Sequence, residues 1–292
     1  MGLGGHLIWT SVIRTLNETS GLPVRVCYAP RVSDLLAGRL YRGDVSWASD
    51  PVFRGNPRIE FPQVVPKPSW LRRVDDLLHR ALQIACLERT YDVLVLGLAR
   101  LARGHLDAHL DLRCHRYVER ETPEGLTWKT GGHIIDIILA NYGMRPLDHR
   151  CEMFFSRAEE EEAASVAREH RIGSEYVVIE PNSKETWFGD LRAWPFERWQ
   201  QIVDHIVSLG RYHVIQVGEG GGQRLHRVID LSGKVPFRVA VCVMKRARLF
   251  LGLDGALMNA ANAVDTPAVV VWGGTALPEF AGYPEMHTII CH

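Results

Sequence analysis

Neither sign of charge is in excess in this sequence, in which 34 Lys and Arg residues balance 34 Asp and Glu residues among 292. A dedicated nucleic-acid binder is usually basic, so the balance argues against that class, although it leaves room for a local basic patch. Long apolar runs are absent too. Runs such as Val93–Leu96 and Ala268–Trp272 have the length of a strand, and none approaches the ~18 residues that span a bilayer. We therefore expect no nucleic-acid partner and no membrane span.

Cysteine is scarce and scattered. The six cysteines include no CxxC pair, which fits neither a disulfide framework nor a zinc knuckle. The N-terminus lacks the basic region and the apolar stretch of a signal peptide, and His6 stands where a myristoylation signal needs Ser or Thr. These absences predict a cytoplasmic protein with reduced thiols and no bound metal.

Length and pattern predict two domains of α/β type. At roughly 100–200 residues per domain, a chain of 292 residues forms two. Short, continuous apolar runs, typical of parallel strands buried on both faces, alternate with amphipathic segments. This order predicts a doubly wound parallel sheet. The expected strands are Val24–Ala29, Arg58–Val65, Asp92–Leu96, Tyr176–Glu180, His213–Val217, Ala247–Leu251, Ala268–Trp272 and His287–Cys291.

Two segments mark the organisation of the second half. Phe196–Leu209 carries one apolar stripe and predicts a helix with Pro195 in its first turn, whereas acidic Ala158–His170 predicts a solvated helix near the domain junction. Both chain ends look truncated, because a glycine loop opens the chain without the strand that normally precedes it and the chain stops just after a strand. The expected regions are an N-terminal domain (1–150), a linker helix (151–174) and a C-terminal domain (175–292).

The first motif is a glycine loop that ends in a histidine, Gly2-Leu3-Gly4-Gly5-His6. We expect a helix to begin near Gly5 and the glycines to let backbone amides approach a ligand. The dinucleotide fingerprint is incomplete, because Leu7 stands at its third glycine position. His6 is a candidate general base, since its unperturbed pKa is ~6.5. The alternative is a surface histidine that caps the helix.

The second motif follows the strand at 176–180 and contains Asn182, Ser183, Lys184 and Arg192. Ligands of open α/β sheets bind at the carboxyl ends of the strands. Hydroxyl and cationic donors at such a place favour phosphate binding. The alternative is an ordinary solvated loop.

The third motif, Gly252–Ala263, lies between two strands, and its small residues predict a tightly packed helix that starts near Ala256. Free amides there would hold a pyrophosphate, and Asp254 would accept hydrogen bonds from sugar hydroxyls or, alternatively, act as the N-cap. A fourth motif, Lys129–His133, predicts a loop that enters helix Ile134–Tyr142, with a structural rather than a catalytic His133.

Together these motifs resemble glycosyltransferase family 9, the ADP-heptose:lipopolysaccharide heptosyltransferases and their relatives. The opening loop is similar to the family's Gly-x-Gly-Asp loop, and residues 180–199 are similar to its strand and Pro-Gly loop followed by Lys-x-Trp-Pro. Leu231–Lys234 and Arg246–Gly274 are similar to its Leu-Ala-Gly-Lys segment and its Asp-Thr-Gly-Pro-Met-His helix. The pieces agree in order over most of the chain. The resemblance implies two Rossmann-like domains facing across a cleft, the GT-B architecture.

The resemblance also implies an inverting glycosyltransferase of lipopolysaccharide biosynthesis. It would move a heptose or a similar sugar from an ADP-heptose-like nucleotide-diphospho-sugar to a cell-surface saccharide or glycolipid acceptor, with a peripheral membrane contact as an option. It would use no cofactor, and no metal, because the sequence has no Asp-x-Asp motif. His6 would be the base, and Gly4, Gly5 and Thr10 would form the acceptor-side loop. The implied donor-binding residues, in the C-terminal domain, are Asn182, Ser183, Lys184, Arg192, Gly218, Asp254, Gly255, Ala256, Met258 and Asn259.

Three positions depart from the family pattern. Gly5 stands in place of the catalytic Asp, Arg192 in place of a Lys, and Asn259 in place of a His. These departures leave open a different donor or a low activity. Three alternatives also stay open: another GT-B enzyme such as a sugar-nucleotide epimerase, a catalytically degenerate nucleotide-sugar-binding protein, and a nicotinamide-dependent enzyme, which the incomplete glycine fingerprint disfavours.

Overall fold

The computed structural model describes residues 2–27, 47–61, 68–84, 107–109, 118–121, 127–130, 132–140, 142–183 and 189–291. The chain forms two compact units. We call Met1–Ile8, Tyr117–Ile134 and Asp148–His292 the C-terminal unit, and Trp9–Arg116 with Ile135–Leu147 the N-terminal unit. Each unit contains its own parallel sheet.

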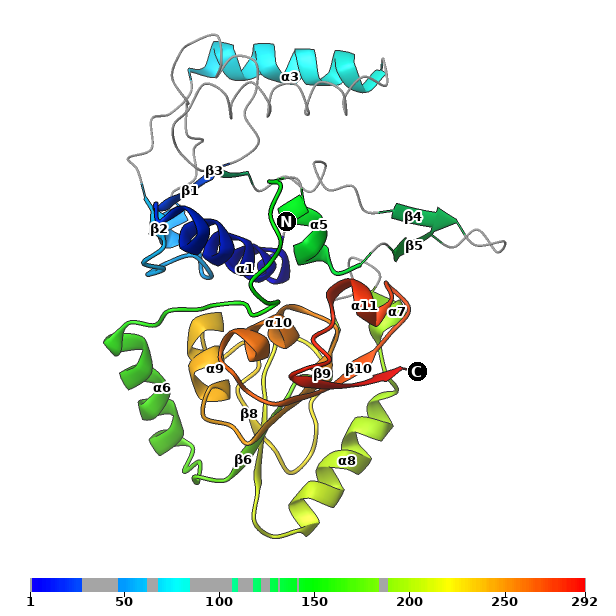
Figure 1. The fold of residues 1–292 in the computed structure, drawn as a ribbon. Helices are drawn as coiled ribbons and strands as arrows, with labels where there is room; N and C mark the ends of the chain where they lie inside the picture. Colours follow the sequence, from blue (N-terminus) through cyan, green and yellow to red (C-terminus); the bar gives the residue numbers. More distant parts are fainter. Residues whose placement is uncertain are drawn as a thin grey trace. The chain divides into compact units, whose positions relative to one another are not determined.

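Six parallel strands form the sheet of the C-terminal unit (Figure 1). They are β6 (Tyr176–Ile179), β7 (His213–Gln216), β8 (Ile229–Asp230), β9 (Leu249–Leu253), β10 (Ala268–Trp272) and β11 (His287–Cys291). The order β11-β10-β9-β6-β7-β8 is that of a dinucleotide-binding sheet, whose winding direction reverses between β6 and β9. The predicted doubly wound parallel sheet is thus confirmed. Strands β10 and β11 have the predicted bounds, and β9 begins two residues later than predicted.

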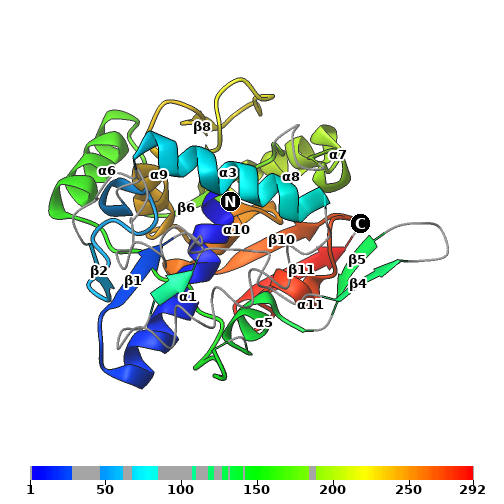
Figure 2. The ribbon, with the colours of Figure 1, turned by 90° about the horizontal axis from the view of Figure 1, so that it is seen from above.

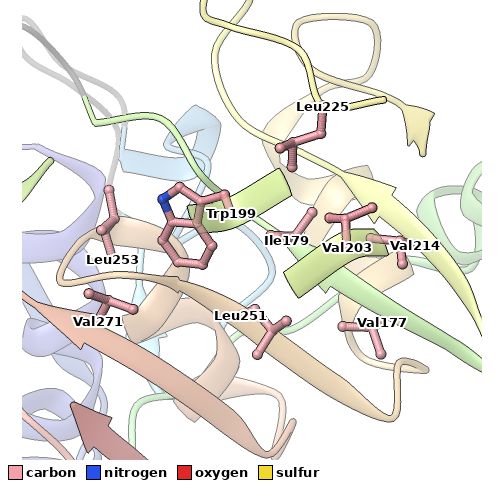
Figure 3. Close-up of a cluster of buried hydrophobic side chains, with 9 residues drawn as sticks. All are labelled: Val177, Ile179, Trp199, Val203, Val214, Leu225, Leu251, Leu253 and Val271. Atoms are coloured by element: carbon pink, nitrogen blue, oxygen red, sulfur yellow. The ribbon is translucent and has the colours of Figure 1, made fainter. Parts of the chain in front are cut away.

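The helices of this unit include α6 (Arg157–Glu169), α7 (Gly189–Arg192), α8 (Phe196–Ser208), α9 (Phe237–Met244), α10 (Ala256–Ala263) and α11 (Pro278–Ala281). Helices α8 and α10 pack against strands of the sheet. Trp199 and Val203 of α8 join side chains of β6, β7, β9 and β10 in a buried cluster (Figure 3). Between Val177 and Ile179 of that cluster, Val178 is buried on the opposite face. Burial on both faces explains why the strands are continuous apolar runs.

The sheet of the N-terminal unit has three described strands in the order β2-β1-β3. They are β1 (Val24–Cys27), β2 (Ile59–Glu60) and β3 (Asp107–His109), and β1 is parallel to both neighbours. The described helices include α1 (Leu3–Ser20), a 3₁₀ turn (Trp47–Ser49), α3 (Ser69–Ile84) and α5 (Ile134–Ala140). The predicted strand at 24–29 is present in its described part, that at 58–65 is a strand only at Ile59–Glu60, and the one at 92–96 lies outside the described residues.

Two features of the first half differ from the sequence prediction. Helix α1 begins at Leu3, not near Gly5, because its first turn closes with a hydrogen bond from the His6 N–H to the Gly2 carbonyl at 3.2 Å. An antiparallel hairpin of β4 (Val118–Glu121) and β5 (Thr127–Thr130) was not predicted (Figure 2). Among the described helices, none is long and apolar enough to cross a membrane.

Candidate functional site

Four loops follow the central strands of the C-terminal unit at the same edge of the sheet. They are Pro181–Ser183 after β6, Gly218–Gly222 after β7, Asp254–Gly255 after β9 and Gly273–Thr275 after β10. Because parallel neighbours end at one edge, these loops lie side by side around the point where the winding reverses. This edge is the candidate functional site.

A carboxylate, a hydroxyl and a guanidinium meet there. The Thr275 hydroxyl donates to Asp254 Oδ2 at 2.8 Å, and Arg192 Nε lies 3.2 Å from the same oxygen. The Asp254 side chain is 7% exposed and that of Arg192 is 32% exposed. Burial raises the pKa of Asp254 above its usual value, while Thr275 and Arg192 partly offset this rise. The N-cap of α10 is Gly255, so the alternative role of Asp254 as the cap is wrong.

Glycines after β10 hold the helix that carries Arg192. A Cβ built on Gly273 would lie 2.6 Å from the Arg192 Cα and still closer to the Leu191 carbonyl, so only glycine fits. The Gly274 N–H donates to the Leu191 carbonyl at 2.8 Å. This backbone contact fixes α7 against the end of β10 and thereby sets the position of Arg192.

The glycine-rich loop after β7 is held by two buried or half-buried amides. Asn182 donates to the Gln223 carbonyl at 2.9 Å and accepts from the Gln223 N–H at 3.1 Å. Gln216 donates to the same carbonyl at 2.8 Å. Gly222 leaves no room for a Cβ, which would lie 2.7 Å from the Asn182 amide, and Gly218 has a φ of 133° that favours glycine. Asn182 therefore fixes the shape of this loop.

Glu180 directly follows β6, beside this loop. A Cβ on Gly218 would lie 3.8 Å from Glu180 Oε1. Burial and the neighbouring Glu219 raise the pKa of Glu180 to about 8, against an opposing effect of Arg192. At neutral pH much of this carboxyl is protonated, so it can donate as well as accept a hydrogen bond.

Helix α10 presents its first amides without a side-chain cap. Gly255 is the N-cap in extended conformation, and no side-chain capping hydrogen bond is found there in the described part of the chain. Met258 and Asn259, both predicted to bind the donor, are buried in α10. Asn259 Nδ2 donates to the Gly255 carbonyl at 2.9 Å. At the end of β6, the Ser183 hydroxyl donates to the Gly189 carbonyl at 2.9 Å.

The structure brings the opening glycine loop to the same helix. A Cβ on Gly4 would lie 3.2 Å from Asn259 Nδ2 and 3.4 Å from the Ala256 Cα. Gly5 and half-buried His6 follow in the first turn of α1. These segments belong to the C-terminal unit, whereas Thr10 lies fully buried in the other unit.

Two other residues singled out in the sequence, His133 and Lys184, lie elsewhere or outside the described residues. His133 is buried and stacks on His149 with ring centroids 3.9 Å apart, in keeping with a structural role. Lys184 lies outside the described residues. Sequence reasoning missed Glu180, Gly273 and Thr275, although each directly follows a predicted strand or lies within three residues of its end, which was the available signal.

The sequence of the chain is similar to that of known glycosyltransferases. The sequence model of glycosyltransferase family 9 (heptosyltransferase) matches residues 150–292. The chain is 24% identical over 159 residues to lipopolysaccharide heptosyltransferase 3 of Escherichia coli, which covers 50% of the chain and 46% of the relative. The same-named protein of E. coli K12 is 24% identical over 115 residues, 36% of the chain and 32% of the relative. The chain thus spans less than half the length of these curated relatives.

Two solved structures share the fold. A family 9 glycosyl transferase from Veillonella parvula has a TM-score of 0.63 at 15% identity, over 100% of this chain and 84% of that one. E. coli ADP-heptose lps heptosyltransferase II has a TM-score of 0.52 at 16% identity, over 92% and 90%. The chain thus has the α/β fold of these GT-B glycosyltransferases. Residues 150–292 are similar to glycosyltransferase family 9.

Proposed function

We propose that the chain is an inverting glycosyltransferase that moves a heptose or a similar sugar from a nucleotide-diphospho-sugar to a saccharide acceptor. The observation that carries the proposal is the pairing of Arg192 with Asp254 beside the uncapped start of α10, at the reversal point of a family 9 sheet. The names of the relatives support an ADP-linked heptose as donor and a lipopolysaccharide as acceptor.

The donor diphosphate is expected to lie against Arg192 and the amides of Gly255 and Ala256. A helix N-terminus and a guanidinium both favour negative charge, and their pull increases as the diphosphate leaves. Asp254 keeps Arg192 in place and offers its carboxylate to sugar hydroxyls. The protein's own groups thus neutralise the diphosphate, and no metal ion takes part in this scheme.

The chemistry is a single in-line displacement at the anomeric carbon. The acceptor oxygen forms the new bond as the bond from the anomeric carbon to the phosphate oxygen breaks, and the nucleoside diphosphate leaves with the electron pair. The acceptor proton passes to His6, which replaces the carboxylate that Gly5 cannot supply. We assign the donor to residues 175–292 and the acceptor to residues 1–150, with 151–174 as the linker.

A lipid-linked acceptor fits one further feature. Helix α3 exposes Trp70, Val74 and Leu77, which recur at helical spacing, and exposed apolar side chains on an amphipathic helix favour a membrane surface. We therefore propose a cytoplasmic protein that contacts the membrane peripherally. Co-flotation with anionic vesicles that is lost in a Trp70→Ser, Leu77→Ser variant supports this contact, and flotation unchanged by the substitutions contradicts it.

A catalytically degenerate nucleotide-sugar-binding protein is the second candidate, favoured by Gly5 and by the internal hydrogen bonds of Asn259. Assaying ADP release from ADP-heptose, with and without a lipopolysaccharide-core acceptor, separates the two. The enzyme predicts acceptor-dependent release, which His6→Gln lowers by about 10²–10⁴-fold with little change in donor affinity. Donor binding without release supports the degenerate protein, and conversion of the donor without an acceptor points to an epimerase-like reaction.

A further inference from the structure

A buried amide holds the first turn of α10. The Asn259 backbone N–H and its Nδ2 group both point to the Gly255 carbonyl, at 3.3 and 2.9 Å. The other end of the side chain, Oδ1, accepts from the Tyr283 hydroxyl at 2.5 Å. Both ends of the Asn259 amide are therefore bonded inside the protein, and the side chain cannot rotate without breaking these bonds.

Tyr283 anchors this amide from a distant segment. It lies between α11 and β11, is buried, and its hydroxyl lies 3.4 Å from Cys151 Sγ. The Cys151 N–H in turn donates to Asn262 Oδ1, in the same helix α10, at 2.6 Å. Burial raises the pKa of Tyr283 far above its usual value, so the hydroxyl keeps its proton and remains a donor.

The opposite side of the amide contacts the opening loop. Gly4 approaches so closely that a Cβ would lie 3.2 Å from Asn259 Nδ2, and 3.4 Å from the Ala256 Cα. Two residues further on, His6 lies in the first turn of α1. One side chain thus contacts both the start of α10 and the segment that carries the candidate base.

On the basis of the proposed function, we propose that Tyr283 and Asn259 are positioning residues for sugar transfer. They fix the first turn of α10, which receives the donor diphosphate, against the Gly4–His6 segment, which supplies the base. Both side chains are neutral, and Asn259 stands where the family pattern has a histidine. The pair therefore orients the anion site without adding a titrating charge to it.

Tyr283→Phe tests this assignment, and Tyr176→Phe is its matched control. Tyr176 is also buried in the C-terminal unit, and its hydroxyl donates to the Val243 carbonyl at 2.7 Å. Both variants lose one buried tyrosine hydrogen bond, so a purely structural role predicts similar losses of stability and unchanged site properties. Measurements on the whole chain, well below its melting temperature, separate positioning from stability.

Three results are expected. Amide hydrogen exchange of the peptide 255–259 accelerates in Tyr283→Phe and not in Tyr176→Phe. The Kd for ADP rises about 3–10-fold in Tyr283→Phe only, as expected for one hydrogen bond. A Tyr283→Phe, Asn259→Ala double variant binds ADP no more weakly than Asn259→Ala alone, because both substitutions break the same path.

The outcomes that overturn the proposal are distinct. If both tyrosine variants keep wild-type ADP affinity and wild-type exchange at 255–259, Tyr283 is only structural. If the losses of ADP affinity add in the double variant, Tyr283 does not act through Asn259. A wild-type chain that binds no ADP overturns the proposed function itself, and the positioning role with it, whatever exchange the variants show.

Discussion

Glu180 is an acidic residue at the candidate site whose pKa is strongly shifted. Its pKa is raised to about 8, first by burial and then by Glu219, against an ordinary value of 4.5. The folded state therefore holds a proton that the unfolded state has lost between pH 4.5 and 8. Stability from this group is full below pH 4.5 and falls as pH rises toward 8.

Glu180→Gln tests this displacement. The amide keeps the shape of the neutral acid and does not ionise, so the variant should gain stability relative to wild type as pH rises from 5 to 8. The gain is at most about 1.4 kcal/mol per pH unit. Urea unfolding at several pH values measures it, and a constant difference between the two proteins would show that Glu180 ionises normally.

The pKa of His287 is shifted in the opposite direction, downward. This residue is buried at the start of β11, its ring nitrogens have no hydrogen-bond partner in the described part of the chain, and burial lowers its pKa from 6.5 to about 4. Its ring lies 5.4 Å from that of Tyr283. As pH falls from 6.5 to 4, His287 is protonated in the unfolded state but stays neutral in the folded state, so the free energy of unfolding declines.

His287→Phe should remove this decline. An apolar ring of similar shape replaces two unsatisfied nitrogens, which is neutral or stabilising. Thermal melts should show the largest advantage of the variant near pH 4.5 and a small one above pH 7. An advantage that is equal at both pH values would mean that His287 does not titrate as its burial predicts.

At the scale of the elements, the contact between β10 and α7 positions the guanidinium. Gly273→Ala places a Cβ against the Leu191 carbonyl and the Arg192 Cα, so α7 must move. We expect a loss of about 1–3 kcal/mol in unfolding free energy and weaker donor binding. Gly274→Ala is the control, because its Cβ would have ordinary contacts at 3.9–4.0 Å. Equal donor affinity in the two variants would argue against a positional role for α7.

Elements buried on both faces were predictable from the sequence. Strands β6, β7, β10 and β11 are continuous apolar runs, and α8 has a clear apolar stripe. Strand β8 is only two residues long, and the hairpin strands read Val-Glu-Arg-Glu and Thr-Trp-Lys-Thr, which carry no buried-strand pattern. Helix α3 is clearly amphipathic, so its signal was present in the sequence, but it was not predicted.

The candidate site was predictable only in part. Arg192, Asp254 and Gly255 follow the strand ends that the pattern located. Thr275 and Tyr283 owe their roles to hydrogen bonds with residues 21 and 24 positions away, which no local pattern reveals. The same holds for Asn259, whose amide the sequence assigned to the donor but which is bonded inside the protein.

At the scale of the whole molecule, the family match, the six-stranded sheet and the candidate site coincide in residues 150–292. The central claim is therefore that this sheet edge binds the diphosphate of a nucleotide-sugar. It concerns a single unit and can be tested with ADP before the sugar and the acceptor are known.

The most direct measurement is calorimetric titration of ADP into wild type, Arg192→Ala and Arg198→Ala. Arg198 is exposed on α8, and its described contact is with the Trp194 ring rather than with Asp254. The variant therefore controls for the loss of a positive charge. Wild type and Arg198→Ala should bind ADP alike, and Arg192→Ala should lose about 1.5–3 kcal/mol, the contribution of a charge-assisted hydrogen bond. Equal ADP affinity in all three proteins would contradict the assignment of the diphosphate to this edge.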